Sequence, residues 1–516
     1  MEYQLKTGVW EITMACNMRC GHCGSSCSER LPDELTTDEA LRLCDDLAEL
    51  ELKKITLSGG EPFLREDWYK IARRLSEHGV EVNVISNGWF IDARLVDLAR
   101  DSGLVNIGIS LDGLEHTHDA IRREGSFARV IRALHLLKKS EFPSAIVTTI
   151  MKRNLHELPQ LQKVLEDQGV ENWQFQIGLP MGNLSRNDII APSQVETIID
   201  FAYNLLDTSP LKPFIADSVG YYTKKVTHIW ETAFGPECGW KGCQAGKTNI
   251  GILHDGIILG CTSIRDDQFV EGNIRETPLR EIWTRPGAFA WNRELTKDDL
   301  TGFCKKCQFG EYCLGGCGNT KLTMTGDLKE NLYCAYRLMI ERLFPKIERI
   351  QDVKTLLARA RKAEELNLYE VAEKCLSRAI VMEPDNLEAL KLFGYICFKL
   401  GDFTQCLEIN QKAVKLNPAD AYIQKGLGVS LAKVGQVEAG ITALKKAIEL
   451  SDEDFLDPYH DLAVVFLENS RPREALGILE QGRQRSVAFQ EVSEKLYQTC
   501  LEAKTQMEKT ENLNFS

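Results

Sequence analysis

The stretch Cys16-Asn17-Met18-Arg19-Cys20-Gly21-His22-Cys23 has three cysteines in the spacing C-x3-C-x2-C, directly after an apolar run at residues 9–14. A loop with this spacing can hold three corners of an iron–sulfur cubane, whereas a four-iron cluster normally takes four cysteines. One iron would then stay open to a ligand that is not protein. A zinc site is the alternative, because C-x2-C pairs are also common among zinc ligands.

Length, charge and cysteine content limit the classes of protein that fit. A chain of 516 residues predicts about three domains at roughly 150 residues each. Its net charge of −13 argues against nucleic acid as a partner. No apolar run reaches the roughly 20 residues of a membrane span, and the first residues lack the order of a signal peptide. We therefore expect no membrane partner and a cytoplasmic location, where clustered cysteines bind metals rather than form disulfides.

Strand-like and helix-like runs alternate from the start of the chain to the vicinity of Trp230. Six β-rich runs are expected at residues 8–15, 53–58, 81–86, 104–110, 145–151 and 172–178. Such alternation predicts a parallel sheet with crossover helices. Six units indicate an α/β fold, a partial (β/α)6 TIM-like barrel, in which chemistry gathers at the C-terminal ends of the strands.

Polar residues follow the second, third and fourth of these strands. The second ends in Ser58-Gly59-Gly60-Glu61-Pro62, the third in Ser86-Asn87-Gly88 and the fourth in Ser110-Leu111-Asp112-Gly113. Two glycines allow the backbone to approach a ligand closely, and Glu61 offers an acceptor for an ammonium group. Turn formation accounts for part of this pattern, but the repeated position indicates a binding site.

A second group of cysteines lies between residues 238 and 334. Its members are Cys238, Cys243, Cys261, Cys304, Cys307, Cys313, Cys317 and Cys334. Two β runs meet at His254-Asp255-Gly256, which predicts a hairpin. Eight cysteines suffice for two fully ligated four-iron clusters. Zinc ribbons are the alternative, although the x5 and x3 spacings fit them poorly.

The N-terminal loop, with the aromatic His22 before its third cysteine, resembles the radical SAM family. In that family the open iron binds the amino and carboxylate groups of S-adenosylmethionine, and one electron cleaves the sulfonium to give a 5′-deoxyadenosyl radical. By this resemblance Cys16, Cys20 and Cys23 hold the cluster. The cofactor contacts implied are His22, Gly59, Gly60, Glu61, Pro62, Ser86, Asn87, Ser110 and Arg122.

Within that resemblance the GGEP motif at residues 59–62 binds the amino group of the cofactor. Ser110 and Arg122 hold its carboxylate, for which an arginine fork is well suited. Arg123, beside Arg122, is the competing interpretation. Asn154 and Gln176, near the ends of the fifth and sixth strands, are further candidates to face the nucleoside.

The later cysteines resemble the SPASM domain, with its seven characteristic cysteines and Cys238 as an eighth. The resemblance implies two auxiliary [4Fe–4S] clusters, and three clusters in total. One would use Cys238, Cys243, Cys261 and Cys317, and the other Cys304, Cys307, Cys313 and Cys334. With Cys238 as a ligand both clusters are closed, which favours electron transfer over substrate binding.

Beyond residue 350 the sequence repeats itself at a fixed period. Arg378-Ala379-Ile380 recurs as Lys412-Ala413-Val414 and as Lys446-Ala447-Ile448. This spacing resembles the tetratricopeptide repeat, an all-α solenoid with a concave binding face. The expected domains are a barrel at 1–232, a cysteine-rich α+β domain at 233–347, repeats at 348–505 and a frayed tail at 506–516.

Three functions compete. The first is a radical SAM maturase that abstracts a hydrogen atom from a peptide or protein docked partly on the repeats, with a flavodoxin- or ferredoxin-type electron donor. The second is a radical SAM dehydrogenase, or a related enzyme, acting on a small molecule. The third is a non-catalytic iron–sulfur scaffold. If a general base exists, the candidates are Asp217, Tyr221, Tyr222, Asp255 and Asp266, which the sequence does not rank.

Overall fold

The computed structural model describes residues 3–236 and 238–513. It divides into two compact units, residues 1–305 with 309–339, and residues 306–308 with 340–516. The sequence predicts a separate cysteine-rich domain from residue 233, but most of that segment belongs to the first unit. The reason is that strand β8 (Asn249–Ile252) pairs directly with β1 (Thr7–Thr13).

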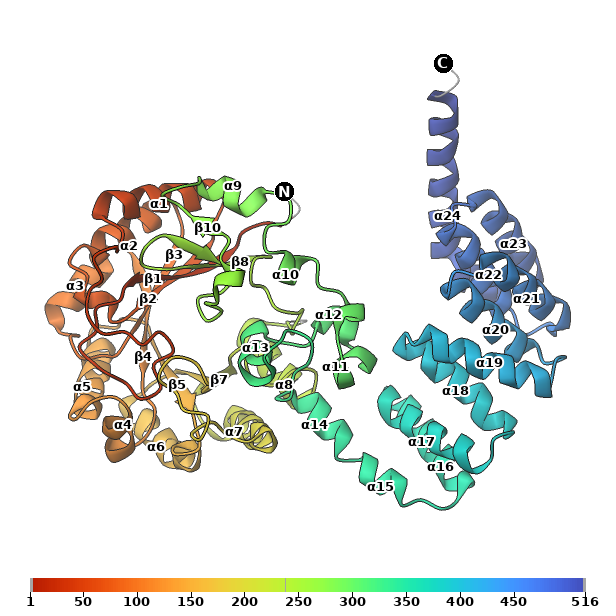
Figure 1. Ribbon diagram of the computed structural model, residues 1–516, viewed down its shortest axis with the longest axis horizontal. Helices are drawn as coiled ribbons and strands as arrows, with labels where there is room; N and C mark the ends of the chain where they lie inside the picture. The colour runs from red at the N-terminus through yellow and green to blue at the C-terminus, as the bar shows by residue number, and fades with distance from the viewer. Residues whose placement is uncertain (1–2, 237, 514–516) are drawn as a thin grey trace. The chain divides into compact units, whose positions relative to one another are not determined.

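The first unit is organised around one ten-stranded sheet, in the order β10-β9-β8-β1-β2-β3-β4-β5-β6-β7 (Figure 1). The strands after β1 are β2 (Lys54–Gly59), β3 (Glu81–Ser86), β4 (Leu104–Ser110), β5 (Ser144–Ile150), β6 (Asn172–Ile177) and β7 (Lys212–Ile215). Each of these runs parallel to its neighbour. The six predicted strands are confirmed as β1 to β6, with ends that differ by at most two positions.

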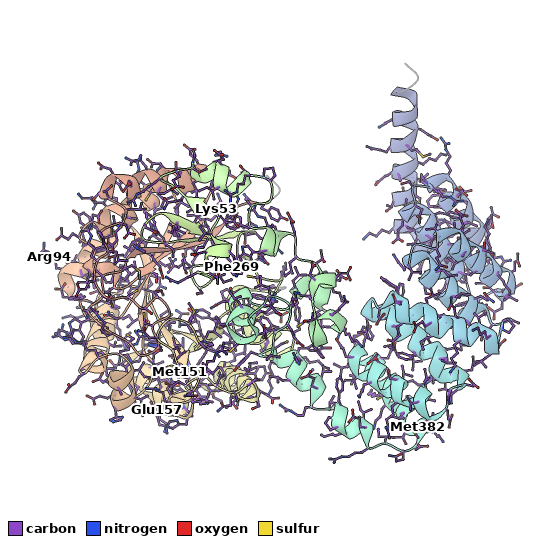
Figure 2. The ribbon with its side chains drawn as sticks, in the orientation of Figure 1. Lys53, Arg94, Met151, Glu157, Phe269 and Met382 are labelled. Carbon is purple, nitrogen blue, oxygen red and sulfur yellow. The ribbon has the colours of Figure 1, made fainter. Side chains whose placement is uncertain are left out.

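Helices connect these strands and cover the outside of the sheet. They are α1 (Thr37–Glu49), α2 (Trp68–Glu77), α3 (Ala93–Asp101), α4 (Glu115–Ile121), α5 (Ser126–Lys139), α6 (Leu158–Gln168), α7 (Val195–Thr208) and α8 (Lys224–Phe234). Helix α1 begins after Thr36, because Thr36 Oγ1 accepts from Glu39 N at 3.3 Å and Thr36 N donates to the Glu39 side chain at 2.8 Å. This reciprocal cap satisfies two of the free donors at the start of the helix. The outer faces carry exposed side chains such as Arg94 on α3 (Figure 2).

The sheet extends beyond the six predicted strands at both edges. Strand β7 is only four residues long and contains Pro213, so its sequence pattern is weak. At the other edge the predicted hairpin forms β8 and β9 (Ile257–Leu259), which are antiparallel, and β10 (Gly272–Asn273) follows. The cysteine-rich segment is therefore continuous with the main sheet.

Short helices complete the first unit around the later cysteines. They are α9 (Leu279–Thr284), α10 (Ala290–Arg293), α11 (Gly302–Lys306), α12 (Gly310–Cys313), α13 (Gly318–Thr325) and α14 (Ala335–Glu341). The hydrophobic core includes the wholly buried Trp10, Trp173 and Trp283. Trp283 comes from α9, so the cysteine-rich segment contributes to the same core as the strands.

The second unit consists of helices only, apart from its connecting segments. They are α15 (Phe344–Glu348), α16 (Val353–Glu365), α17 (Tyr369–Met382), α18 (Leu387–Leu400), α19 (Phe403–Leu416), α20 (Ala421–Lys433), α21 (Val437–Leu450), α22 (Asp457–Glu468), α23 (Pro472–Arg485) and α24 (Val487–Leu513). Helices α16, α18 and α20 start at evenly spaced positions, Val353, Leu387 and Ala421, and this spacing matches the period of the sequence. Helix α24 continues to Leu513, whereas the sequence predicts a frayed tail from residue 506.

Small residues allow the paired helices of this unit to approach closely. A Cβ on Gly428 of α20 would lie 2.6 Å from Leu444 Cγ of α21. Within the described residues, no helix combines the length and the apolarity that a membrane span requires.

Candidate functional site

Backbone and side-chain hydrogen bonds fix the three-cysteine loop at the C-terminal end of β1. Gly21 N donates to Ile121 O at 2.9 Å, and Asn183 Nδ2 donates to Cys20 O at 3.1 Å. Asn87 Nδ2 donates to Asn17 Oδ1 at 2.8 Å, which ties the loop to the end of β3. The loop is therefore held by three different connections of the sheet.

A buried charge cluster lies beside this loop. Asp112, which is fully buried, accepts from Arg122 Nε at 2.5 Å and from Thr149 N at 2.9 Å, and lies 3.0 Å from His22 Nε2. Burial acts to raise the pKa of Asp112, but the charges of Arg122 and His22 outweigh it and hold this pKa well below its usual range. Because Asp112 engages Nε and Nη2 lies 3.5 Å from His22 Nε2, Nη1 is the nitrogen of the Arg122 guanidinium that is left for another partner.

The structure distinguishes Arg122 from Arg123. The side chain of Arg122 lines the central cavity described below, beside His22. Arg123 is exposed instead, donates to Asn17 O at 2.9 Å and lies 4.3 Å from the Trp89 ring centroid. Of the two, only Arg122 faces the cavity.

Glu61 has a different position from the one that the sequence suggests. Its carboxylate is wholly buried and accepts from Ser86 Oγ at 2.9 Å and from Asn87 N at 2.8 Å. Burial raises the pKa of Glu61 to about 7. Neither Glu61 nor Pro62 lines the cavity, whereas Gly59, Gly60 and both partners of Glu61 do. Glu61 thus connects the ends of β2 and β3.

The two glycines at the end of β2 touch the chain after β1. Gly59 has a φ of +131°, and a Cβ on Gly60 would lie 2.1 Å from the carbonyl oxygen of Ala15. Any side chain at position 60 would displace the start of the three-cysteine loop.

We expect Gly60→Ala to lower the free energy of unfolding by about 2 kcal/mol, because the added methyl group must push backbone aside. Gly477→Ala is the matched control, since Gly477 lies within α23 and a Cβ there meets nothing within 4 Å. The control should raise stability by about 0.5–1 kcal/mol. Urea unfolding of both variants measures the difference, and equal stability of the two would contradict the close contact.

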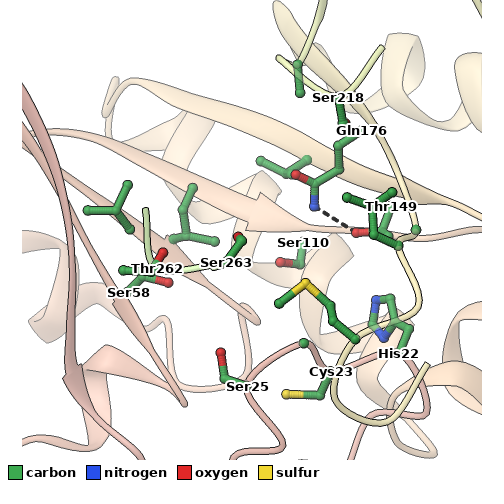
Figure 3. Close-up of a pocket in the computed structure, with 18 of the residues that line it drawn as sticks. His22, Cys23, Ser25, Ser58, Ser110, Thr149, Gln176, Ser218, Thr262 and Ser263 are labelled. Carbon is green, nitrogen blue, oxygen red and sulfur yellow. Dashed lines mark hydrogen bonds between the residues drawn. The ribbon is translucent and has the colours of Figure 1, made fainter. Parts of the chain in front are cut away.

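Above the strand ends lies a cavity of about 670 Å³, here called the central chamber. Figure 3 shows Ser58, Ser110, Thr149 and Gln176 around it, with His22 and Cys23 from the loop. Its wall also includes Cys261, Thr262 and Ser263 after β9. The chamber therefore joins the first cysteine loop to the later cysteine-rich segment.

Of the two nucleoside candidates, one lies in the chamber. Gln176 lines it and donates from Nε2 to Thr149 Oγ1 at 2.8 Å (Figure 3). Asn154 is buried, and its Nδ2 donates to Asp112 O at 2.6 Å and Thr149 O at 2.8 Å. The prediction for Asn154 is wrong in position, because its amide stabilises the turns after β4 and β5.

A second ion pair, not foreseen from the sequence, lies in the chamber wall. Arg265 Nη2 contacts Glu11 Oε1 and donates to Ser25 Oγ at 2.6 Å, and Ser25 Oγ donates to Glu11 at 2.7 Å. The three residues come from β1, the first loop and the segment after β9. The inward position of Glu11 on β1 was the available signal, because a charged residue interrupts an otherwise apolar strand.

The later cysteines form two groups in the first unit. The electrostatic neighbours of the Cys317 thiol include Cys243 and Cys261. The electrostatic neighbours of the Cys313 thiol include Cys334 and Cys304. Each group contains three members of one of the two sets implied by resemblance.

The two remaining cysteines are placed differently. Cys238 donates from its thiol to Phe234 O at 3.2 Å. Cys307 belongs to residues 306–308, which are part of the second unit, and is buried. Spacing and resemblance alone therefore support these two as ligands.

The candidate bases differ in whether they line the chamber. Asp217 lines the chamber, where the surrounding protein raises the pKa of its carboxyl by desolvation. Tyr221 is buried, donates to Asp217 O at 2.5 Å and accepts from Cys317 N at 2.9 Å, so its hydroxyl is used in the fold. Tyr222 donates to Trp240 O at 2.5 Å. Asp255 and Asp266 lie outside the chamber lining.

A single zinc ion requires thiolates that lie close to one another. Tetrahedral thiolates at about 2.3 Å from zinc lie about 3.8 Å from one another. Across the described ranges, one set of three His, Cys, Asp or Glu side chains has all its ligand atoms within 4.8 Å, namely Asp33, His254 and Asp255. No three of the described thiols meet that limit, and thiolates are also the usual ligands of iron–sulfur clusters.

Comparison with known families and curated proteins agrees with this geometry. Residues 10–165 match the radical SAM superfamily, and residues 243–308 match SPASM, an iron–sulfur cluster-binding domain. The AdoMet-dependent heme synthase of Methanosarcina barkeri is 32% identical over 339 residues, covering 64% of this chain and 95% of the relative. The mycofactocin maturase MftC of Mycobacterium ulcerans is 28% identical over 315 residues, covering 60% and 81%.

Solved structures share the fold. Native anSMEcpe with bound AdoMet and the Cp18Cys peptide superposes with a TM-score of 0.52 at 20% identity, covering 66% of this chain and 97% of that one. Streptococcus suis SuiB bound to S-adenosylmethionine gives 0.52 at 15% identity, covering 64% and 76%. The chain therefore belongs to the radical SAM superfamily, with a SPASM domain, and it carries the S-adenosylmethionine-binding [4Fe–4S] cluster and the auxiliary clusters that these domains imply.

Proposed function

We propose that the chain is a radical SAM maturase that abstracts a hydrogen atom from a peptide held partly by its second unit. The observation that carries the proposal is the set of paired helices in the second unit, which recur at the period of the sequence repeat. We interpret these pairs as tetratricopeptide repeats and the parallel sheet as a partial (β/α)6 barrel extended at both edges. Repeats of this kind usually present a binding surface.

We assign the cofactor contacts by residue. Cys16, Cys20 and Cys23 would hold the first cluster, and Nη1 of Arg122 with Ser110 would hold the carboxylate of S-adenosylmethionine. Gly59 and Gly60, which line the chamber beside the loop, would lie next to its amino group. When bound and reduced, cluster and cofactor supply a 5′-deoxyadenosyl radical.

The surrounding side chains orient these contacts. Asp112 fixes the plane of the Arg122 guanidinium through Nε and keeps His22 beside it. Ser86 and Asn87 hold Glu61, which keeps the glycine loop in place. Asp217 is the proposed proton acceptor, because it is the candidate base whose carboxyl lines the chamber.

For the auxiliary clusters we propose the two ligand sets implied by resemblance. One is Cys238, Cys243, Cys261 and Cys317, and the other is Cys304, Cys307, Cys313 and Cys334. With four ligands each, neither cluster has an open iron, so both serve electron transfer. A flavodoxin or ferredoxin is the proposed donor, and the seventeen free cysteines suit a reducing cytoplasm.

The proposed docking surface is the face formed by the first helix of each pair, here called the first-helix face. Lys391 and Lys425 occupy equivalent positions of successive repeats, on α18 and α20, and both lie over the ring of Tyr422, at 5.3 and 5.4 Å from its centroid. Acidic residues of the following repeats pair with them, Asp420 at 2.9 Å and Asp457 at 3.1 Å. Nearby Phe398 and Lys399 of α18 are exposed.

The experiment is co-expression of the full chain with short open reading frames near its gene, followed by mass spectrometry of the peptides. For a modified peptide, we expect Phe398→Asp with Lys399→Glu to raise KM about tenfold, or about 1.4 kcal/mol, with kcat nearly unchanged. Val381→Asp is the control, because Val381 is 80% exposed on the second helix α17. Unchanged KM in the double variant would contradict docking on this face.

One observation favours a second candidate, a small substrate that carries carboxylates. Arg265 lines the chamber with Nη2 held by Glu11 and Ser25, which leaves Nη1 for a ligand. Relatives include proteins named heme synthase, Fe-coproporphyrin III synthase and pre-heme d1 synthase. On this alternative the substrate would be a carboxylate-bearing tetrapyrrole.

Arg265→Gln separates the two candidates. If Arg265 binds a substrate carboxylate, loss of its charge should weaken binding of Fe-coproporphyrin about 10- to 100-fold, since charged hydrogen bonds contribute roughly 1.5–3 kcal/mol. Absorbance titration of the full chain with that compound measures the affinity. No binding to the wild-type chain, or equal binding to both proteins, would eliminate the alternative.

A further inference from the structure

A buried lysine lies among the auxiliary cysteines. Lys321 on α13 is 1% exposed, and its Nζ donates to Leu314 O at 2.6 Å. Among the described residues, no Asp or Glu forms an ion pair with this ammonium group. A buried charge of this kind is costly unless another charge compensates it.

Burial lowers the pKa of Lys321, and thiols from both cysteine groups oppose this effect, namely Cys243 and Cys317 of one group and Cys304 and Cys313 of the other. Lys321 thus lies where a single positive charge acts on both auxiliary sites.

The backbone is shaped to admit the lysine stem. Gly315 and Gly316 have φ values of +77° and +81°, and a Cβ on Gly315 would lie 2.9 Å from Lys321 Cδ. Glycine is the residue that adopts such φ values without strain. The loop between Cys313 and Cys317 therefore makes room for a long cationic side chain.

Four thiolates and a [4Fe–4S]²⁺ core carry a net charge of −2, which becomes −3 when the core gains one electron. A fixed positive charge in a poorly solvated interior stabilises the more negative state, and net charge is one determinant of cluster potential. We propose that Lys321 is the shared counter-charge of the two auxiliary clusters and raises the reduction potential of both.

This inference rests on the two-cluster assignment and not on the identity of the substrate. Its test therefore needs no substrate. A failure of the peptide proposal would leave it intact, and the reverse also holds.

The experiment is a redox titration of the full-length, anaerobically reconstituted protein, followed by electron paramagnetic resonance. The first cluster is the internal reference, because added S-adenosylmethionine alters its signal alone. In Lys321→Met, we expect both auxiliary midpoints to fall by at least about 59 mV, a tenfold change in the ratio of reduced to oxidised cluster for one electron. The reference midpoint should not move. Unchanged auxiliary midpoints at full iron content would overturn the proposal, and so would a shift in one cluster alone.

Two further variants keep the test decisive if Lys321→Met assembles poorly. Lys321→Gln can still donate to Leu314 O but has no charge, so its midpoints should also fall, whereas Lys321→Arg should stay near wild type. Wild-type midpoints in Lys321→Gln would mean that the hydrogen bond, and not the charge, is the function of this residue. Lys247→Met is the matched control, because Lys247 is only partly buried and has Cys243 as its single thiol neighbour, and it should shift one cluster at most.

Discussion

Replacement of Cys20 by alanine should reduce the formation of 5′-deoxyadenosine at least about a thousandfold, since even the outer-shell partners of a metal ligand typically contribute 10- to 100-fold. Cys20 is buried in the loop whose backbone is fixed by Ile121 and Asn183. Loss of one thiolate leaves two, too few to retain a cubane with one open iron. Chromatographic assay of 5′-deoxyadenosine from dithionite-reduced protein measures the effect.

Cys27 provides the matched control for this experiment. It lies four positions after Cys23, is 4% exposed and lines the same chamber; its thiol contacts Met14 Sδ at 3.9 Å and the Cys23 thiol, and its backbone N–H, which alanine keeps, donates to Cys23 Sγ at 3.5 Å. We expect Cys27→Ala to retain most of the activity. If Cys27→Ala abolishes cleavage while Cys20→Ala does not, the ligand assignment in this loop is wrong.

Substitution of Asp112 by asparagine should have the second-largest effect. The carboxylate of Asp112 is the buried counter-ion of Arg122, and loss of one partner from a buried pair destabilises a protein by about 3–5 kcal/mol. Arg122 would also lose the contact at Nε that orients its Nη1. We therefore expect a loss of about 3 kcal/mol in unfolding free energy and a dissociation constant for S-adenosylmethionine at least about tenfold higher, since a charge-assisted hydrogen bond contributes roughly 1.5–3 kcal/mol.

Asp119→Ala is the control that distinguishes a loss of stability from a loss of affinity for S-adenosylmethionine. Asp119 lies on the short helix α4, which leads into Arg122, and its carboxylate accepts from Gly125 N at 2.7 Å and Phe127 N at 2.8 Å. Loss of this cap should cost about 1 kcal/mol of stability without changing affinity for the cofactor. Urea unfolding and calorimetric titration with S-adenosylmethionine measure both quantities. Wild-type affinity in Asp112→Asn would contradict the role given to Arg122.

The strands and cysteine motifs could be predicted because each depends on residues that are close together in the sequence. Parallel strands such as β3 and β5 are short apolar runs between turns, and the spacing of Cys16, Cys20 and Cys23 depends on one loop. Strand β7 is very short and contains a proline, so nothing local marks it. The junction of β8 with β1 pairs Thr7 with Asn249, and periodicity does not reveal contacts between positions so far apart in the chain.

Side-chain roles at the site depended on burial, which the sequence does not give. Glu61 follows two glycines and looks like a ligand contact, but Ser86 and Asn87 bind it inside the protein. Asp112 lies within a turn motif that the sequence marks, yet its pairing with Arg122 requires the fold. Lys321 is indistinguishable in sequence from a surface lysine, and only its burial among thiols marks it.

The central claim is that one iron of the first cluster stays open to S-adenosylmethionine. Electron–nuclear double resonance on the reduced full-length protein, with cofactor labelled at its methionyl nitrogen and carboxylate oxygen, tests this most directly. We expect hyperfine coupling from both labels, and no coupling in Cys20→Ala. An intact first cluster without coupling from either label would contradict it.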